Sequence, residues 1–173
     1  MSKHVFLIGF MGSGKTHWGR KAAVALSRPF LDLDARIEAR EGKSIARIFG
    51  ENGEAGFREL EKQCLRDLKG LPPSIIATGG GTPCFFDNMA WMRAHGHVVY
   101  LKTPPEILFE RLKPEREQRP LLKSLDDAGL SDFIRQRLAA RAPAYERADC
   151  IIERTDDGGL FLTQLLDLIR TFG

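Results

Sequence analysis

The sequence predicts an α/β fold in which one five-stranded parallel sheet carries helices on both faces. Short apolar runs recur along the whole chain, and stretches with helical spacing separate each run from the next. Parallel strands need such crossovers, because the chain must return to the same end of the sheet before it pairs again. The 173 residues, 43% of them apolar and 28% charged, suffice for one packed domain and exclude a disordered chain.

Five apolar runs are the expected strands, and helical patterns fill most of the chain around them. The strands are expected at residues 5–8, 30–34, 74–77, 98–101 and 150–152. The helices are expected at 16–26, 35–68 with a break at Asn52-Gly53, 87–95, 104–112, 131–141 and around 162–169. Residues 113–126 are polar and punctuated by proline, so we expect a mobile surface segment there. Ligands of such sheets bind at the carboxyl ends of the strands.

Charge and cysteine content exclude several other classes of protein. The formal net charge of +3 arises from dispersed basic residues, so no nucleic-acid partner is expected. Three widely spaced cysteines form no Cys-x-x-Cys pair, which predicts a reducing, cytoplasmic location rather than a disulfide scaffold. The apolar runs are far shorter than the ~20 residues of a membrane helix, so no membrane partner is expected either. We expect a monomer.

A phosphate-binding loop follows the first expected strand. Residues 9–16, GFMGSGKT, match G-x-x-x-x-G-K-[ST] between a strand and a helix, which is the context this motif requires. The glycines let backbone N–H groups point at phosphates, and the helix adds the positive end of its dipole. Lys15 would reach the β- and γ-phosphates and Thr16 would ligate Mg²⁺. The expected nucleotide contacts of this loop are Gly12, Ser13, Gly14, Lys15 and Thr16.

Two carboxylates follow the second expected strand. Asp32 and Asp34 are two residues apart, so on a strand they would project to the same side. Asp32 would hold Mg²⁺ directly or through water. Asp34 would accept a proton from an acceptor hydroxyl, or it would cap a helix that begins at Ala35. The sequence favours neither role of Asp34 over the other.

The chain resembles the shikimate kinases in several segments that follow the order of that family. The GFRELE, ATGGGT and RAPAY stretches are more specific than the phosphate loop, which many unrelated nucleotide enzymes share. The segments are GFMGSGKT (9–16), FLDLDARIE (30–38), GKSIARIF (42–49), GEAGFRELE (53–61), ATGGGT (77–82), VVYL (98–101), RPLL (119–122) and RAPAYERAD (141–149).

This resemblance implies the three-layer, nucleoside-monophosphate-kinase-like fold of a P-loop NTPase. It also implies transfer of the ATP γ-phosphoryl group to the 3-hydroxyl of shikimate with Mg²⁺, in aromatic amino-acid biosynthesis. Residues 1–173 would form a single kinase domain. That domain would include a mobile lid at about 113–126 and a shikimate-binding helical segment at about 34–61.

The resemblance also assigns roles to residues of this sequence. His17 stands where the family commonly has Thr or Ser. Its backbone N–H would still contact the α-phosphate of ATP, whereas a hydroxyl contact is lost and the role of its side chain stays open. The loop that begins at Glu153 differs from the family pattern. The implied roles are catalysis by Lys15, Asp34 and Arg119; shikimate binding by Asp34, Arg58, Gly79, Gly80, Gly81 and Arg141; and ATP binding by the phosphate loop, His17, Arg111 (against adenine), Arg119 and Arg154.

The chemistry of these side chains supports the implied acceptor, although other interpretations remain. Two guanidinium forks, Arg58 and Arg141, suit a carboxylate, and a glycine run lets a ring approach closely. Alternatively, Arg58 pairs only with Glu54 or Glu61, and Arg141 is a solvated cation at a helix end. A gluconate-kinase-like enzyme, a nucleoside monophosphate kinase and a non-catalytic nucleotide-binding module are the competing functions.

Overall fold

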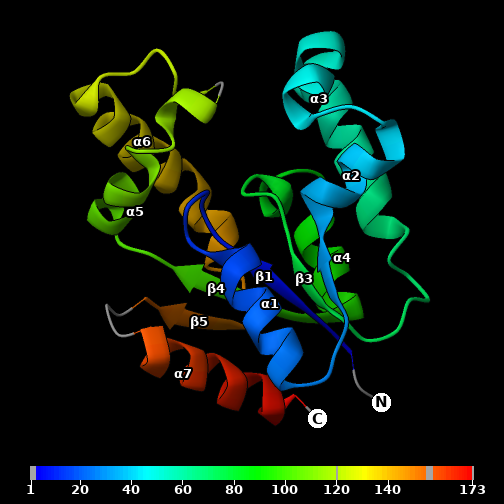
Figure 1. Cartoon of the computed structure of the whole chain (residues 1–173). Coiled ribbons are helices and arrows are strands. Elements are labelled where there is room, and N and C mark those ends of the chain that lie inside the picture. The colour runs from blue at the N-terminus through cyan, green and yellow to red at the C-terminus, as the bar shows by residue number, and fades with distance from the viewer. Residues whose placement is uncertain (1–2, 120, 155–157, 173) are drawn as a thin grey trace.

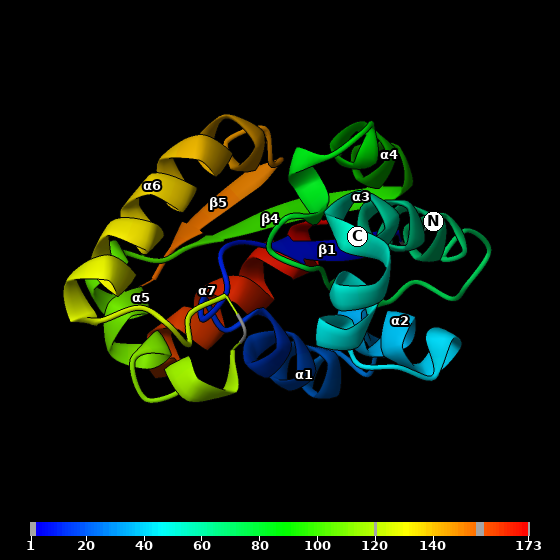
Figure 2. The same ribbon diagram turned by 90° about the horizontal axis from the view of Figure 1, so that it is seen from above.

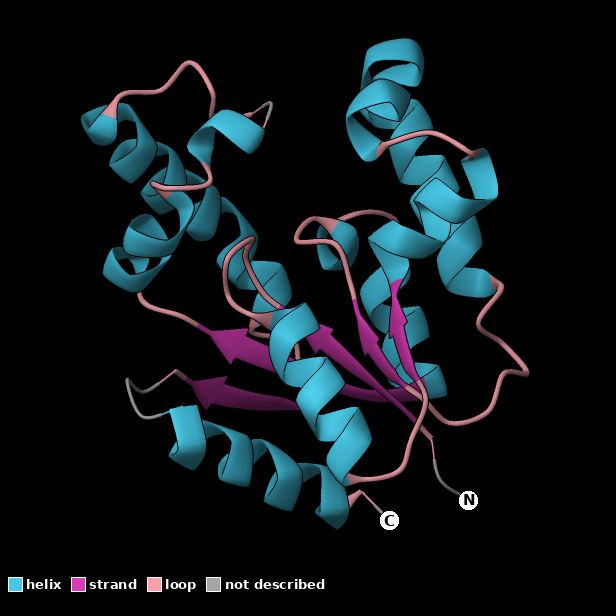
Figure 3. Cartoon of the chain, viewed as in Figure 1, coloured by secondary structure: helices cyan, strands magenta, loops and turns pink. Residues whose placement is uncertain are grey.

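A computed structural model describes residues 3–119, 121–154 and 158–172, and it has the expected α/β architecture (Figures 1 and 3). Five strands form one sheet in the order β2-β3-β1-β4-β5, and every pairing is parallel. All five predicted strands are therefore confirmed, with ends shifted by up to two residues. The strands are β1 (His4–Ile8), β2 (Phe30–Asp32), β3 (Ile75–Ala77), β4 (Gly96–Lys102) and β5 (Cys150–Glu153).

Helices cover both faces of the sheet, because alternate strand residues point to opposite sides. Val5 and Leu7 of β1 pack in one cluster with residues of α1 (Lys15–Ala25) and α7 (Gly158–Thr171). Phe6 and Ile8 pack on the other face. The cluster there includes residues of α2 (Leu33–Glu41), α3 (Ile45–Arg66), α4 (Asn88–His95) and α6 (Asp127–Tyr145).

A third cluster joins α5 (Pro105–Leu112) to α6 and to the phosphate loop. Phe10 of that loop is buried in it together with Leu122. The segment expected to be polar surface, 113–126, thus contributes a core side chain, and it contains a short 3₁₀ turn at Arg116–Gln118. Pro120 lies outside the described residues. This cluster packs Leu122 of the 113–126 segment together with Phe10 of the phosphate loop.

Two predicted boundaries were wrong in ways that affect the site. The second strand ends at Asp32, and Asp34 lies in the first turn of α2 rather than on a strand. Asp32 is itself the cap, since its Oδ1 accepts hydrogen bonds from the backbone N–H groups of Asp34 and Ala35. Helix α6 continues past residue 141 and includes Pro143 and Tyr145. The break at Gly53 is confirmed by its left-handed φ of 67°.

The helices rise on two sides of the phosphate loop above the carboxyl ends of the strands. Helices α2 and α3 lie on one side, and α5 and α6 lie on the other, with the loop after β1 between them (Figures 1 and 2). The described helices include none that is both long and apolar enough to cross a bilayer.

Candidate active site

The loop after β1 is folded as a phosphate cradle. Gly9, Gly12 and Gly14 have φ values of 146°, 80° and 89°, which side chains with a Cβ rarely adopt. The amine of Lys15 donates hydrogen bonds to the carbonyls of Gly9 (2.8 Å) and Phe10 (2.9 Å). Burial lowers the pKa of Lys15 to about 8, against the raising effect of Asp34 and Asp32. A phosphate would therefore give this buried cation the counter-charge that it lacks.

Thr16 and Asp32 form an oxygen pair next to the phosphate loop. The Thr16 hydroxyl donates a 2.7 Å hydrogen bond to Oδ2 of Asp32. The other oxygen of Asp32 caps α2, so the carboxylate is held at both ends. A hydroxyl and a carboxylate are ligands that suit Mg²⁺, which also takes water and phosphate oxygens in such sites.

A cavity of about 560 Å³ connects the phosphate loop with the predicted acceptor side. Ser13 does not line this cavity but is buried within the loop. Arg58, Gly79, Gly81 and Arg141 do not line it either. The predicted site residues that do are Gly12, Gly14, Lys15, Thr16, His17, Asp32, Asp34, Gly80, Arg111, Arg119 and Arg154.

Three predicted nucleotide-binding arginines surround the mouth of this cavity. Arg111 donates to the carbonyl of Gly12 (2.9 Å), and its pKa is lowered by burial and by the charge of Arg154. The guanidinium of Arg154 lies 5.3 Å from the ring centre of Trp18. Arg119 is paired with Glu115 at 2.5 Å. Thr155 and Asp156, in the loop that begins at Glu153, lie outside the described residues.

The glycine run, residues 79–81, is the point at which the predicted acceptor residues meet. A Cβ atom added at Gly81 would lie 2.5 Å from Nη2 of Arg58, and one at Gly80 would lie 3.1 Å from Nη1 of Arg141. A Cβ atom at Gly79 would lie 3.0 Å from Oδ1 of Asp34. Segments far apart in the sequence thus bring two guanidinium groups and one carboxylate to the same short loop.

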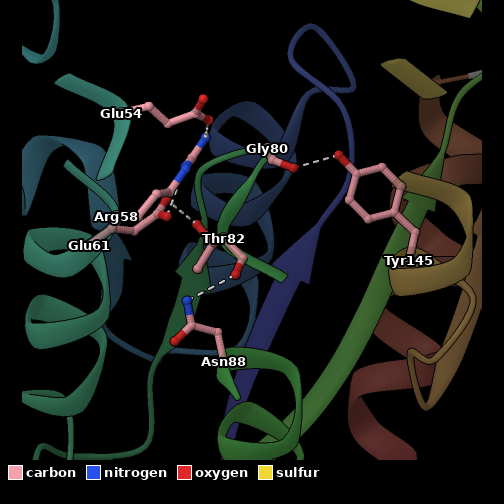
Figure 4. Close-up of polar contacts among 7 residues, drawn as sticks. All are labelled: Glu54, Arg58, Glu61, Gly80, Thr82, Asn88 and Tyr145. Carbon is pink, nitrogen blue, oxygen red and sulfur yellow. Dashed lines mark hydrogen bonds and ion pairs between the residues drawn. The ribbon is translucent and has the colours of Figure 1, made fainter. Parts of the chain in front are cut away.

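Arg58 lies in a buried, partly aromatic setting on α3. It pairs with Glu61 (2.9 Å) and with Glu54 (3.2 Å) (Figure 4). Its guanidinium lies 4.2 Å from the ring centre of Phe85. Glu61 is fully buried and accepts a 2.5 Å hydrogen bond from Thr82. The ion pairs with Glu54 and Glu61, which the sequence offered as an alternative role for Arg58, are therefore present. Arg58 nevertheless lies beside the glycine run as well.

Asp34 is the carboxyl group with the raised pKa in this site. Burial raises the pKa of Asp34 to about 6, and the neighbouring carboxylates of Glu61 and Asp32 add to the effect, while Lys15 and Arg58 oppose it. Oδ1 of Asp34 and Nη1 of Arg141 are both buried without a hydrogen-bond partner among the described residues. Buried polar atoms are rarely left unpaired, so both atoms are available to bond to a ligand.

Several residues of the site have no distinct signal in the sequence. Met11, Trp18, Thr78 and Glu115 also line the cavity. Tyr145 donates a 2.6 Å hydrogen bond to the carbonyl of Gly80. Tyr145 belongs to the RAPAY stretch and Glu61 to GFRELE, so both lie inside segments that carry the family resemblance, yet their contacts depend on distant parts of the chain.

Comparisons with known proteins decide the family. The shikimate kinase family model matches residues 11–169. A shikimate kinase from Bacteroides thetaiotaomicron is 47% identical over 147 residues, which cover 85% of this chain and 84% of the relative. The chain belongs to the shikimate kinase family. Its activity is that of a shikimate kinase, an ATP-dependent phosphotransferase of aromatic amino-acid biosynthesis.

Solved structures of the family have the same fold as the chain. A 1.7 Å crystal structure of the Bacteroides thetaiotaomicron enzyme matches with a TM-score of 0.92 and 42% identity, over 97% of this chain and 98% of that one. The Acinetobacter baumannii enzyme in complex with shikimate matches with a TM-score of 0.89 and 35% identity, over 99% and 94%. The nucleoside-monophosphate-kinase-like fold predicted from the sequence is confirmed.

The predicted competitor, a gluconate kinase, shares only the fold. A gluconokinase from Sinorhizobium meliloti matches with a TM-score of 0.64 over 98% of this chain and 92% of that one, but with 16% identity. The sequence similarity that decides the family is the similarity of this chain to shikimate kinases, not to gluconokinases.

Proposed function

We propose that the chain transfers the γ-phosphoryl group of ATP to the 3-hydroxyl of shikimate with Asp34 as the proton acceptor. The observation that carries this proposal is the convergence of Asp34, Arg58 and Arg141 on the glycine run beside the phosphate loop. Arg58 and Arg141 would bind the carboxylate of shikimate in forked hydrogen bonds, which sets the direction of the ring. The opposite side of the ring would then present a hydroxyl to Asp34.

Two cavities meet at the proposed point of transfer. Besides the cavity at the phosphate loop, a second one of about 470 Å³ is lined by residues of α2, α3 and the lid. Met11, Asp34 and Arg119 line both cavities. This arrangement supports a nucleotide in the first cavity and phosphoryl transfer at the residues that the two share. Arg58 and Arg141 line neither cavity, and their closeness to the glycine run is what supports the place of the acceptor.

Lys15 and Arg119 would stabilise the charge of the phosphoryl group as it moves. Lys15 would exchange its bonds to the carbonyls of Gly9 and Phe10 for bonds to phosphate oxygens, which are stronger acceptors because they are charged. Arg119 would leave Glu115 and turn to the phosphates when the lid closes. Closure would exclude the water that could otherwise take the phosphoryl group.

Mg²⁺ fits the pair formed by Thr16 and Asp32. The hydroxyl and the carboxylate lie together in the lining of the nucleotide cavity, and both are oxygen donors. When bound, the ion would neutralise charge on the β- and γ-phosphate oxygens.

Three further expectations from the sequence also stay predictions. They are the cytoplasmic location, the single kinase domain and the monomeric state.

A coupled assay of ADP release tests the proposed acceptor. With ATP and Mg²⁺ present, we expect shikimate to stimulate ADP release strongly, whereas gluconate and nucleoside monophosphates leave it at the rate of the enzyme alone. The Arg116→Ala variant serves as a control and should keep the same acceptor preference, because Arg116 pairs with Asp127 of α6 and does not line either cavity. Stimulation by gluconate or a nucleotide, but not by shikimate, would contradict the proposal.

A further inference from the structure

Tyr145 links the last turn of α6 to the glycine run. Its side chain is fully buried, and its hydroxyl donates a 2.6 Å hydrogen bond to the carbonyl of Gly80 (Figure 4). Among the described residues this is the only hydrogen bond between α6 and residues 79–84. The ring of Tyr145 packs against that of Tyr100 on β4, with 4.9 Å between the ring centres. The ring is thus anchored in the core, while the hydroxyl holds the loop.

Arg141 lies one helical turn before Tyr145, so both side chains leave the same face of α6. Nη1 of Arg141 lies 3.1 Å from the position of a Cβ atom at Gly80. The same glycine is therefore bonded through its carbonyl to Tyr145 and faces the guanidinium group of Arg141. The Tyr145 hydroxyl also interacts with the side chain of Arg141, so it contacts both the loop and that arginine.

The other side of the glycine run is held by α3 and α4. Thr82 donates to Glu61, and the side-chain amide of Asn88 donates to the carbonyl of Thr82 at 3.0 Å (Figure 4). Glu61 also pairs with Arg58. Two hydrogen bonds thus fix the loop to the side of the site that carries Arg58. The Tyr145 hydroxyl fixes it to the side that carries Arg141.

We propose that Tyr145 is a positioning residue that sets the separation of Arg141 from Arg58, and thereby the affinity for the carboxylate of the acceptor, without touching the acceptor. This inference rests on the proposed function. Burial raises the pKa of Tyr145 well above its usual value, so the hydroxyl remains a donor over the working range of pH.

The Tyr145→Phe variant tests the proposal, because it removes the hydroxyl and keeps the ring. We expect the KM for shikimate to rise by about five- to thirtyfold, as the carbonyl of Gly80 loses its buried partner and the loop moves relative to Arg141. The values of kcat and of the KM for ATP should change by less than about twofold, because Lys15, Thr16 and Arg119 lie outside the affected contact. Tyr100→Phe is the matched control. Tyr100 is also buried, but its hydroxyl makes no hydrogen bond within the described part of the chain. The KM of the Tyr100→Phe enzyme for shikimate should therefore equal that of the parent.

Two further measurements separate positioning from a general loss of structure. If Tyr145 acts through Arg141, adding Tyr145→Phe to Arg141→Lys should weaken shikimate binding, measured by calorimetry, by less than about twofold. Placing 4-aminophenylalanine at position 145 restores a donor and should return the KM for shikimate to near the parental value, and this variant also serves if Tyr145→Phe does not fold. Any one of three results would overturn the inference. The KM for shikimate is the same in Tyr145→Phe and parent, the losses of shikimate affinity add up in the double variant, or the amine does not restore the KM. Failure of the parent to bind shikimate would instead overturn the proposed function.

Discussion

Replacing Arg119 by alanine is expected to lower kcat by about a thousandfold or more, while shikimate affinity changes by less than about threefold. Arg119 lines both cavities at the point where they meet, and a guanidinium group there would stabilise charge that develops only during transfer. Steady-state kinetics together with calorimetric binding of shikimate would measure the two effects separately.

Arg116→Ala is the matched control for this variant. Both arginines lie in the 113–126 segment and both are paired with a carboxylate, but Arg116 pairs with Asp127 and lines neither cavity. Its kcat should stay within about twofold of the parent, since lost surface ion pairs have small effects. The kcat of Arg119→Lys should lie between those of the parent and of Arg119→Ala, because lysine keeps the positive charge but lacks the forked guanidinium group. Parental turnover in Arg119→Ala would remove Arg119 from the mechanism.

The Asp34→Asn variant should lose about a hundredfold to ten-thousandfold in kcat, because an amide cannot accept the hydroxyl proton. The parent adds a second test through its pH dependence. The pKa of Asp34 is raised to about 6, and only the ionised form accepts a proton. The kcat/KM for shikimate should therefore fall as the pH drops below about 6, and Asp34→Asn should lack this acidic limb.

Glu41→Gln is a suitable control for Asp34→Asn. Glu41 lies two turns further along α2, pairs with Arg40 at 3.6 Å and lines neither cavity. Loss of one partly exposed ion pair has a small effect, so kcat and the acidic limb should be close to parental. An unchanged acidic limb in an active Asp34→Asn enzyme would show that another group accepts the proton.

Much of the fold could be predicted from the sequence because its signals are local. A run such as Val5 to Ile8 is buried on both faces, and it has the continuous apolar pattern of such a strand. The boundary at Asp32 was harder to place. The alternation Leu31-Asp32-Leu33-Asp34 has the period of a strand, and the capping contact of Asp32 that starts α2 appears only in the folded chain. Pro143 likewise suggested the end of a helix that in fact continues to Tyr145.

The site shows the same division between local and distant contacts. Lys15 and Thr16 could be found from the spacing of one motif. Arg58 and Arg141 could be assigned only through the family resemblance, since a single arginine in a helix is more often an exposed cation. The supporting contacts of Glu61 with Thr82 and of Tyr145 with Gly80 join residues 21 and 65 positions apart, and no local pattern encodes them.

A crystal structure of the chain with shikimate and ADP tests the central claim most directly. The account predicts that the carboxylate of shikimate lies between Arg58 and Arg141. It also predicts that the ring rests on the glycine run and that a hydroxyl is within hydrogen-bond distance of Asp34. Shikimate bound elsewhere, with either arginine turned away from its carboxylate, would contradict the account.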